Sequence, residues 1–114
     1  MNDGVWSAAR LWTANKVTFQ FGKLEIRAKF PEGNFNWPAI WMLGANYAPP
    51  NKIFGTTQWP ESGELDIAEG LAGNSVDQGT IHGLDSSGGD WRGGAGVTAV
   101  APLANISDAF HVWG

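Results

Sequence analysis

Polar and apolar residues alternate most regularly in the segment 23–30, which reads Lys-Leu-Glu-Ile-Arg-Ala-Lys-Phe. Side chains on a strand point alternately to its two faces, so the charged residues would share one face. The other face would carry Leu24, Ile26, Ala28 and Phe30. Residues 17–21 also alternate, and Gly22 marks a bulge or bend between the two runs. The pattern predicts strands with one buried and one solvated face.

Further along the chain, apolar segments alternate with turn-forming ones. Residues 37–43 are apolar throughout and predict a buried strand. Shorter strands are expected at 64–69 and 78–82, and another apolar stretch begins at 109–113. Turns or loops are expected at 31–34, 44–60, 70–75 and 83–96. Because no convincing amphipathic helix of more than two turns is found, we expect an all-β protein, specifically a sandwich.

Composition narrows the class of protein. The chain has 114 residues, enough for one modest domain, and its net charge of −4 argues against a nucleic-acid partner. It has no cysteine, which excludes disulfides and thiolate metal sites. No apolar run approaches the roughly 20 residues of a membrane helix, and residues 1–4 do not form a signal peptide. With 16 glycines and 7 tryptophans, the composition suits a turn-rich β protein with aromatic binding surfaces.

Three carboxylates interrupt the segment 64–69, Glu-Leu-Asp-Ile-Ala-Glu. A helix is the alternative to a strand here, but the six residues fenced by Gly63 and Gly70 are too few for an ordinary one. A regular strand would place Glu64 and Asp66 on one face and Glu69 on the other. An extra residue in a β-bulge at 67–68 would bring all three acids to the same face.

Such a cluster is costly, because like charges raise the pKa of at least one carboxyl. Glycoside hydrolysis uses this arrangement: one carboxylate attacks the anomeric carbon, and a second, protonated carboxyl protonates the leaving oxygen. A third acid between them can hold the nucleophile by a hydrogen bond and tune both titrations. The alternative is a solvated acidic strand face, and the triplet alone leaves both interpretations open.

The residues around the triplet favour the first interpretation. Glu64-x-Asp66-x-x-Glu69, preceded by Trp59-Pro60 and Gly63, resembles the active-site signature of glycoside hydrolase family 16. The laminarinase-like members, which are endo-β-1,3-glucanases, are the most similar, whereas lichenases and xyloglucan transglycosylases have an unbulged Glu-x-Asp-x-Glu pattern. The segments that also resemble the family are 7–11, 21–29, 37–44, 80–83 and 110–113.

This resemblance implies a jelly-roll β-sandwich of the concanavalin A-like lectin/glucanase type. Residues 1–114 would be the central portion of a single catalytic domain, incomplete at both ends. The implied activity is retaining, endo-acting hydrolysis of β-1,3(-1,4)-glucan. Glu64 matches the nucleophile, Asp66 the assisting carboxylate and Glu69 the general acid/base, whose pKa its neighbours would raise. The chain departs from the family after His82, where residues 83–89 lack the Pro and Tyr of many members, so the linkage preference stays open.

Aromatic residues complete the implied site. Trp59 and His82 match positions that line the sugar site, and Trp37 and Trp41 would add stacking surface. The alternative is that these tryptophans belong to the core and that His82 is a structural histidine. Four further aromatic residues are left as core, structural or unassigned: Trp6, Trp12, Trp113 and His111.

The resemblance also bears on ligands and partners. No cofactor and no metal ligand is assigned in this chain, although the family's structural calcium ion would belong near the two ends of the full domain. The expected partner is a β-glucan polysaccharide, with no nucleic acid and no membrane, and the full-length protein would be an extracellular monomer. Two alternatives remain: a non-catalytic glucan-binding module of the same fold and an inactive gene fragment. Binding relatives have lost the catalytic glutamates, which this chain keeps.

Overall fold

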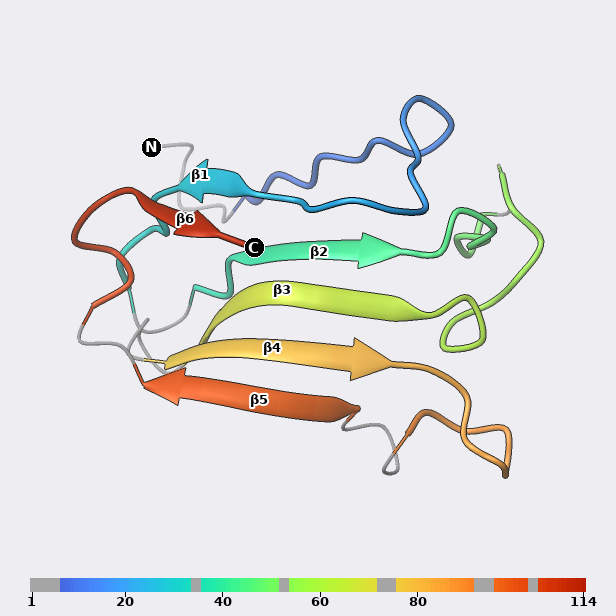
Figure 1. Cartoon of the computed structure of the whole chain (residues 1–114). Coiled ribbons are helices and arrows are strands. Elements are labelled where there is room, and N and C mark those ends of the chain that lie inside the picture. Colours follow the sequence, from blue (N-terminus) through green and yellow to red (C-terminus); the bar gives the residue numbers. More distant parts are fainter. Residues whose placement is uncertain (1–6, 34–35, 52–53, 72–75, 92–95, 103–104) are drawn as a thin grey trace.

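The computed structural model describes residues 7–33, 36–51, 54–71, 76–91, 96–102 and 105–114. These residues form antiparallel strands and no helix, which confirms the all-β class (Figure 1). The strands are β1 (Ile26–Ala28), β2 (Ala39–Leu43), β3 (Glu64–Leu71), β4 (Val76–His82), β5 (Val97–Pro102) and β6 (His111–Trp113). No helix in the described part of the chain is long and apolar enough to cross a membrane.

The strands form two sheets. β2, β3, β4 and β5 follow one another in a four-stranded sheet, while β1 pairs only with β6. Residues from both sheets meet in one core. That core consists of Phe30, Ala68, Ile106 and Trp113, with Ala28, Ile40 and Ile67 packed against it. The rings of Phe30 and Trp113 stack with centroids 4.6 Å apart, which locks β6 over the segment that follows β1.

The alternation predicted for residues 23–30 is confirmed by burial. The apolar positions are half-buried or buried, ending at Phe30 with 4% exposure, while the charged positions between them are exposed. The regular strand is shorter than predicted, because β6 pairs only with Ile26–Ala28. The prediction of a strand at 17–21 is wrong: these residues pair with no described strand, and Phe21 is 85% exposed. Gly22 lies at a bend, with a positive φ of 128°.

The strands differ from the sequence prediction in three further respects. The strand expected at 37–43 begins at Ala39, and it is not a buried strand, since Ala39 is exposed and the rest of β2 only half-buried. β3 continues through Gly70 and Leu71, so the turn expected at 70–75 starts later, and residues 72–75 lie outside the described part. β5 was not predicted: its Pro and small residues give little alternation, and pairing with β4 defines it.

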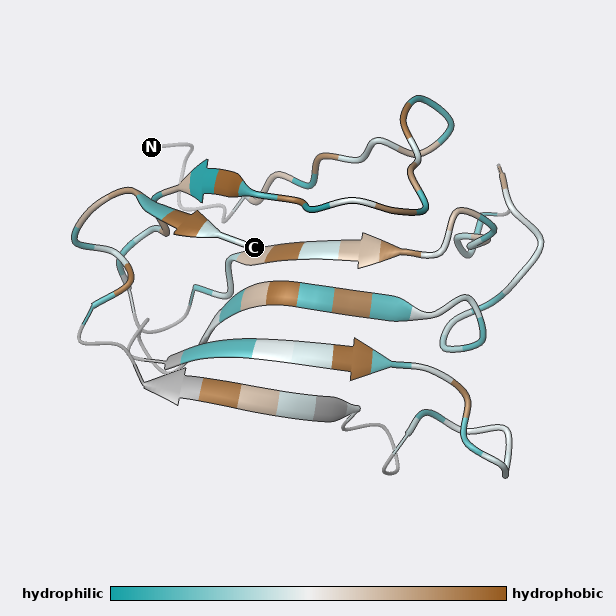
Figure 2. Ribbon diagram, viewed as in Figure 1, coloured by the Kyte–Doolittle hydropathy of each residue, from teal (hydrophilic) through white to brown (hydrophobic). Residues whose placement is uncertain are grey.

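The two faces of the four-stranded sheet differ in chemistry. Directly paired residues share a face, so Trp41, Asp66 and Thr80 lie in one row across β2, β3 and β4. The opposite face carries apolar residues, among them the cross-strand pair Leu65 and Ile81. Figure 2 shows the resulting change between hydrophilic and hydrophobic residues along β3.

Candidate active site

A β-bulge in β3 sets the geometry of the site. Asp66 pairs with Thr80 and Glu69 with Gln78, so the two residues Ile67 and Ala68 oppose a single residue on β4. The register on the β2 side shifts at the same place. The bulge predicted at 67–68 is therefore confirmed.

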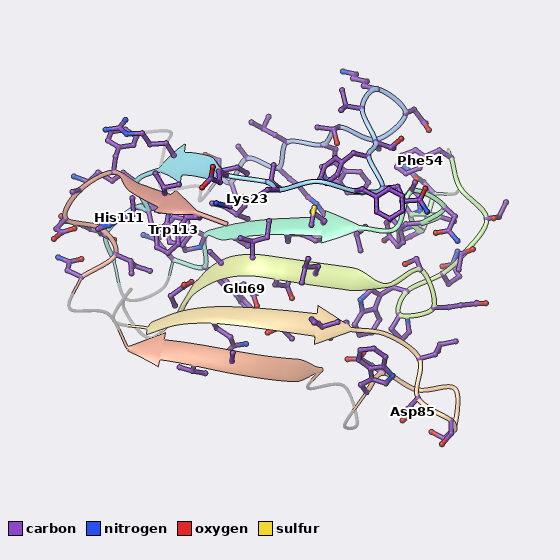
Figure 3. The ribbon with its side chains drawn as sticks, viewed as in Figure 1. Lys23, Phe54, Glu69, Asp85, His111 and Trp113 are labelled. Atoms are coloured by element: carbon purple, nitrogen blue, oxygen red, sulfur yellow. The ribbon has the colours of Figure 1, made fainter. Side chains whose placement is uncertain are left out.

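The bulge brings the three acids to one face. They line an open pocket of about 320 Å³ together with residues of β2 and the segment before it; the lining residues are Trp37, Ala39, Trp41, Glu64, Asp66 and Glu69. Glu69 lies on β3 in Figure 3. A strand without the bulge would turn Glu69 to the opposite face, where the core lies.

Asp66 is the buried member of the cluster, with 5% exposure. Burial, together with the negative charges of Glu69 and Glu64, raises the pKa of Asp66 to about 7, against a smaller lowering by His82. Asp66 also shares a side-chain hydrogen bond with Glu64. The raised pKa is thus found on Asp66, whereas the sequence predicted it for Glu69.

Each outer carboxylate accepts a hydrogen bond from an indole. Trp59 Nε1 donates to Glu64 Oε2 at 2.6 Å, and Trp37 Nε1 donates to Glu69 Oε1 at 2.9 Å. Both tryptophans are exposed, at 42% and 68%, so neither belongs to the core. Trp37 also lines the pocket, whereas Trp59 is next to it through its hydrogen bond to Glu64.

Trp41 and Trp12 both contact the guanidinium of Arg10, on the β2 side of the site. Trp41 is half-buried, lines the pocket, and has the Arg10 guanidinium 4.4 Å from its ring centroid. The same guanidinium lies 4.2 Å from the ring of Trp12, which also contacts two aromatic rings of the loop after β2, Tyr47 and Phe54. One cation therefore braces two tryptophans on the β2 side of the site.

His82, at the end of β4, joins the cluster from the other side. Its Nε2 lies 3.3 Å from Asp66 Oδ2, and its ring centroid lies 5.6 Å from that of Trp59. Its Nδ1 lies 2.7 Å from Oδ2 of Asp90, a buried acid that the sequence analysis did not identify. No spacing signal could have found Asp90, because its contact depends on how residues 83–91 fold back.

The remaining aromatic residues lie elsewhere. Trp113 is 6% exposed and belongs to the core. His111 Nε2 lies 2.9 Å from Oδ1 of the exposed Asp108. Figure 3 labels Trp113 and His111. Trp6 lies outside the described residues. Within the described residues, no group of three or more His, Asp or Glu side chains is arranged to hold a metal ion.

Comparison with known proteins agrees with this fold. No family model matches the chain. Over 78 residues, or 68% of the chain, it is 42% identical to a "Beta-glucanase" of Rhodothermus marinus. Over 94% of the chain it is 37% identical to a "Beta-1,3-glucan-binding protein" of Penaeus monodon. The solved laminarinase of Rhodothermus marinus matches 89% of the chain with a TM-score of 0.70 and 33% identity.

The chain is thus similar to laminarinase-like members of glycoside hydrolase family 16, and its all-β fold matches part of the laminarinase jelly-roll sandwich. It spans 26% and 29% of the length of the two relatives and 38% of the solved laminarinase.

Proposed function

We propose that the protein containing this chain is a retaining, endo-acting glycoside hydrolase that cleaves β-1,3- or mixed β-1,3-1,4-linked glucan. The observation that carries the proposal is the bulge that places Glu64 and Glu69 in one pocket with Asp66 between them. Similarity to proteins named as a beta-glucanase and a laminarinase supports the substrate class.

In the first step, a carboxylate oxygen of Glu64 bonds to the anomeric carbon as the bond to the leaving sugar oxygen breaks. Glu69 supplies the proton that this oxygen takes up. In the second step, water attacks the anomeric carbon, gives a proton back to Glu69, and releases Glu64 as a carboxylate. Both carboxyls return to their starting protonation states.

The hydrogen bonds around the acids suit these roles. Glu64 accepts one from Trp59, and it shares one with Asp66, which is about half protonated near pH 7. Two donors stabilise the negative charge of a nucleophile. Glu69 accepts one from Trp37, which holds it at the other side of the pocket. Asp66 therefore acts as the assisting acid that orients Glu64.

The pocket surface suits a polysaccharide. The exposed rings of Trp59 and Trp37 offer apolar faces next to the two glutamates, and the pocket opens to solvent. An open site admits the interior of a polymer, as endo cleavage requires. A substrate of this size is met outside cells, so we include an extracellular location in the proposal.

A non-catalytic glucan-binding module is the second candidate. It is favoured by the 37% identity to the protein of Penaeus monodon that is named for β-1,3-glucan binding. The hydrogen-bonded acid triplet favours the enzyme instead, because binding alone does not require an acid with a raised pKa. Full-length protein that binds laminarin but releases no reducing sugar would favour the binding module.

The stereochemistry of the product tests the mechanism. Full-length protein is mixed with laminarin, and the anomeric protons of the fresh product are followed by NMR. We expect the β anomer first, with the α anomer appearing only as the product mutarotates. The Glu64→Gln variant is the matched control, which should release almost no product. Early appearance of the α anomer would contradict the retaining mechanism.

A further inference from the structure

Asp90 is a buried carboxylate behind the candidate active site with no role in the steps above. It is 6% exposed, and its two oxygens have separate partners. Oδ2 lies 2.7 Å from His82 Nδ1, and Oδ1 accepts the backbone N–H of Gly83 at 3.0 Å. On the other edge of the same imidazole, Nε2 faces Asp66 Oδ2 at 3.3 Å. His82 therefore links two acids that come from different parts of the chain.

We propose that Asp90 is a positioning residue, which keeps a proton on His82 Nδ1 and directs His82 Nε2 at Asp66. Asp66 then receives a hydrogen bond from the imidazolium on one side and donates its own proton to Glu64 on the other. The chain of contacts runs from Asp90 through His82 and Asp66 to Glu64. This inference rests on the proposed function of Glu64.

The loop after β4 is built to hold Asp90 in place. Residues 83–91 fold back on themselves, with Leu84 bridged to Asp90 and the Trp91 N–H donating to the Gly83 carbonyl. The Trp91 indole donates to the Leu84 carbonyl at 2.6 Å and packs on Gly83, where an added Cβ would lie 3.3 Å from the ring. The contacts within this loop therefore hold the Asp90 carboxylate in position before any ligand binds.

The space beside the imidazole is also restricted. Gly96 has a positive φ of 63°, and a Cβ there would lie 3.0 Å from His82 Nδ1 and 2.7 Å from Thr80 Cγ2. A larger residue at this position would collide with Thr80 and crowd the His82 ring. The close approach of Gly96 therefore restricts the ring beside Nδ1, the same atom that contacts Asp90.

The charges around His82 are consistent with a protonated imidazole. Burial would lower the pKa of His82, but the hydrogen bond and negative charge of Asp90, with the charges of Asp66 and Glu64, raise it. Burial likewise would raise the pKa of Asp90, but its hydrogen bonds from His82 and Gly83 lower it overall. Among the described residues, the charged groups that face His82 are Asp66 and Glu64 of β3 and Asp90 of the loop. The ring of Trp59 lies next to the imidazole.

The protonation of His82 can be measured directly by NMR in the full-length protein. In the unchanged protein, ¹⁵N shifts should show a proton on Nδ1 at every pH from 6 to 9, and a titration midpoint above the ordinary histidine value. Asp90→Asn removes the charge but keeps the size of the side chain. The variant should lower the His82 midpoint by about one pH unit or more, the range for loss of an opposite charge at this distance.

The same chain offers a matched control. Asp108 contacts His111 on the surface at 2.9 Å, so Asp108→Asn should alter the signals of His111 and leave those of His82 unchanged. Glucan hydrolysis should fall about ten- to a hundredfold in kcat in Asp90→Asn, with little change in KM, and stay unchanged in Asp108→Asn.

The outcomes separate the positioning role from the proposed function. A neutral His82 with its proton on Nε2 in the unchanged protein, or an unchanged midpoint in Asp90→Asn, would overturn the role of Asp90. The first of these results, in the unchanged protein, depends neither on activity nor on whether a variant folds. If His82 behaves as expected but the unchanged protein hydrolyses no glucan, the proposed function fails and the positioning of His82 stands.

Discussion

The two faces of the four-stranded sheet are made by the same strands, yet they present opposite chemistry. On one face of β3, Glu64, Asp66 and Glu69 line the pocket, while on the other Ile67 and Ala68 both pack on the core. Two successive residues can point the same way only because the strand bulges there. One inserted residue therefore completes an acidic site and an apolar core at once.

The apolar face itself differs between its two ends. At the bulge, Ala68 is fully buried beneath residues such as Ile106. At the far end, the paired Leu65 and Ile81 are 39% and 45% exposed. The same kind of surface is thus a packed core at one end and an exposed apolar patch at the other.

The largest effects are expected on the acidic face. In the full-length protein, Glu64→Ala and Glu69→Ala should each lower kcat by about 10²- to 10⁴-fold or more, because each removes a group that takes part in bond breaking. Laminarin hydrolysis by reducing-sugar release measures this loss. Circular dichroism and melting temperature should stay near those of the unchanged protein, since both side chains lie at the pocket surface.

Glu61 provides the control for these two variants. It is an exposed acid of the preceding loop and does not line the pocket, so Glu61→Ala should retain full activity. A Glu69→Ala variant with near-normal turnover would show that the bulge serves packing alone.

The second prediction compares the two ends of the apolar face. Ile106→Ala should lower the free energy of unfolding by about 2–5 kcal/mol, because it leaves a cavity in a fully buried position. Leu65→Thr should change it by only about 0.5 kcal/mol, since the side chain is already exposed and Thr suits a strand. Urea unfolding of the 114-residue chain measures both.

The two substitutions should have opposite effects on the self-association of the chain. The exposed patch of Leu65 and Ile81 favours self-association, so Leu65→Thr should reduce the aggregated fraction on size-exclusion chromatography, whereas Ile106→Ala should increase it. A chain that is already a monodisperse monomer before any substitution would contradict the role given to the patch.

The sequence predicted the acidic face more fully than the sheet around it. The spacing of Glu64, Asp66 and Glu69 required a bulge, and the register shift occurs at the predicted place. Burial along 24–30 also follows the predicted alternation. In both cases the information is local, since side-chain direction follows from the strand period.

What was missed depends on partners distant in sequence. The alternating run at 17–21 has no strand beside it, and β5 exists because β4 offers it an edge. Asp90 reaches His82 only because the loop folds back. Similarly, the raised pKa is found on Asp66 because it is the buried acid, and burial could not be inferred from charge spacing. The catalytic roles of the three acids stay predictions.

The third prediction concerns the cost of burying Asp66 on the acidic face. Its pKa is about 7 in the folded protein and 3.8 as the reference for an unfolded chain. Between these values the folded state holds a proton that the unfolded state has lost, so this group's contribution to stability falls as pH rises from about 4 to about 7. Above pH 7 the ionisation of Asp66 therefore lowers the free energy of unfolding by up to ~4 kcal/mol. Asp66→Asn removes this pH-dependent decrease, because the amide does not ionise.

Melting curves of the full-length protein and of Asp66→Asn from pH 4 to 8 measure this difference. The variant should be the more stable at pH 8, and the gap should shrink toward pH 4, while glucan hydrolysis falls but stays measurable. A gap that is constant with pH would mean that Asp66 does not titrate in this range.

The smallest effect is expected from separating the two contacts of Trp59. Trp59→Phe keeps an aromatic ring but removes the N–H that donates to Glu64 Oε2 at 2.6 Å. Since this hydrogen bond orients a charged group, kcat should fall about tenfold with little change in KM. Trp59→Ala also removes the ring, so KM should rise in addition, by the equivalent of about 1–3 kcal/mol if sugar stacking resembles stacking on nucleic-acid platforms. Trp12→Phe, a ring of similar exposure without a contact to the acids, should leave kcat unchanged. A sharp fall in melting temperature with unchanged KM in Trp59→Ala would place this residue with the packed face of the molecule instead of the acidic one.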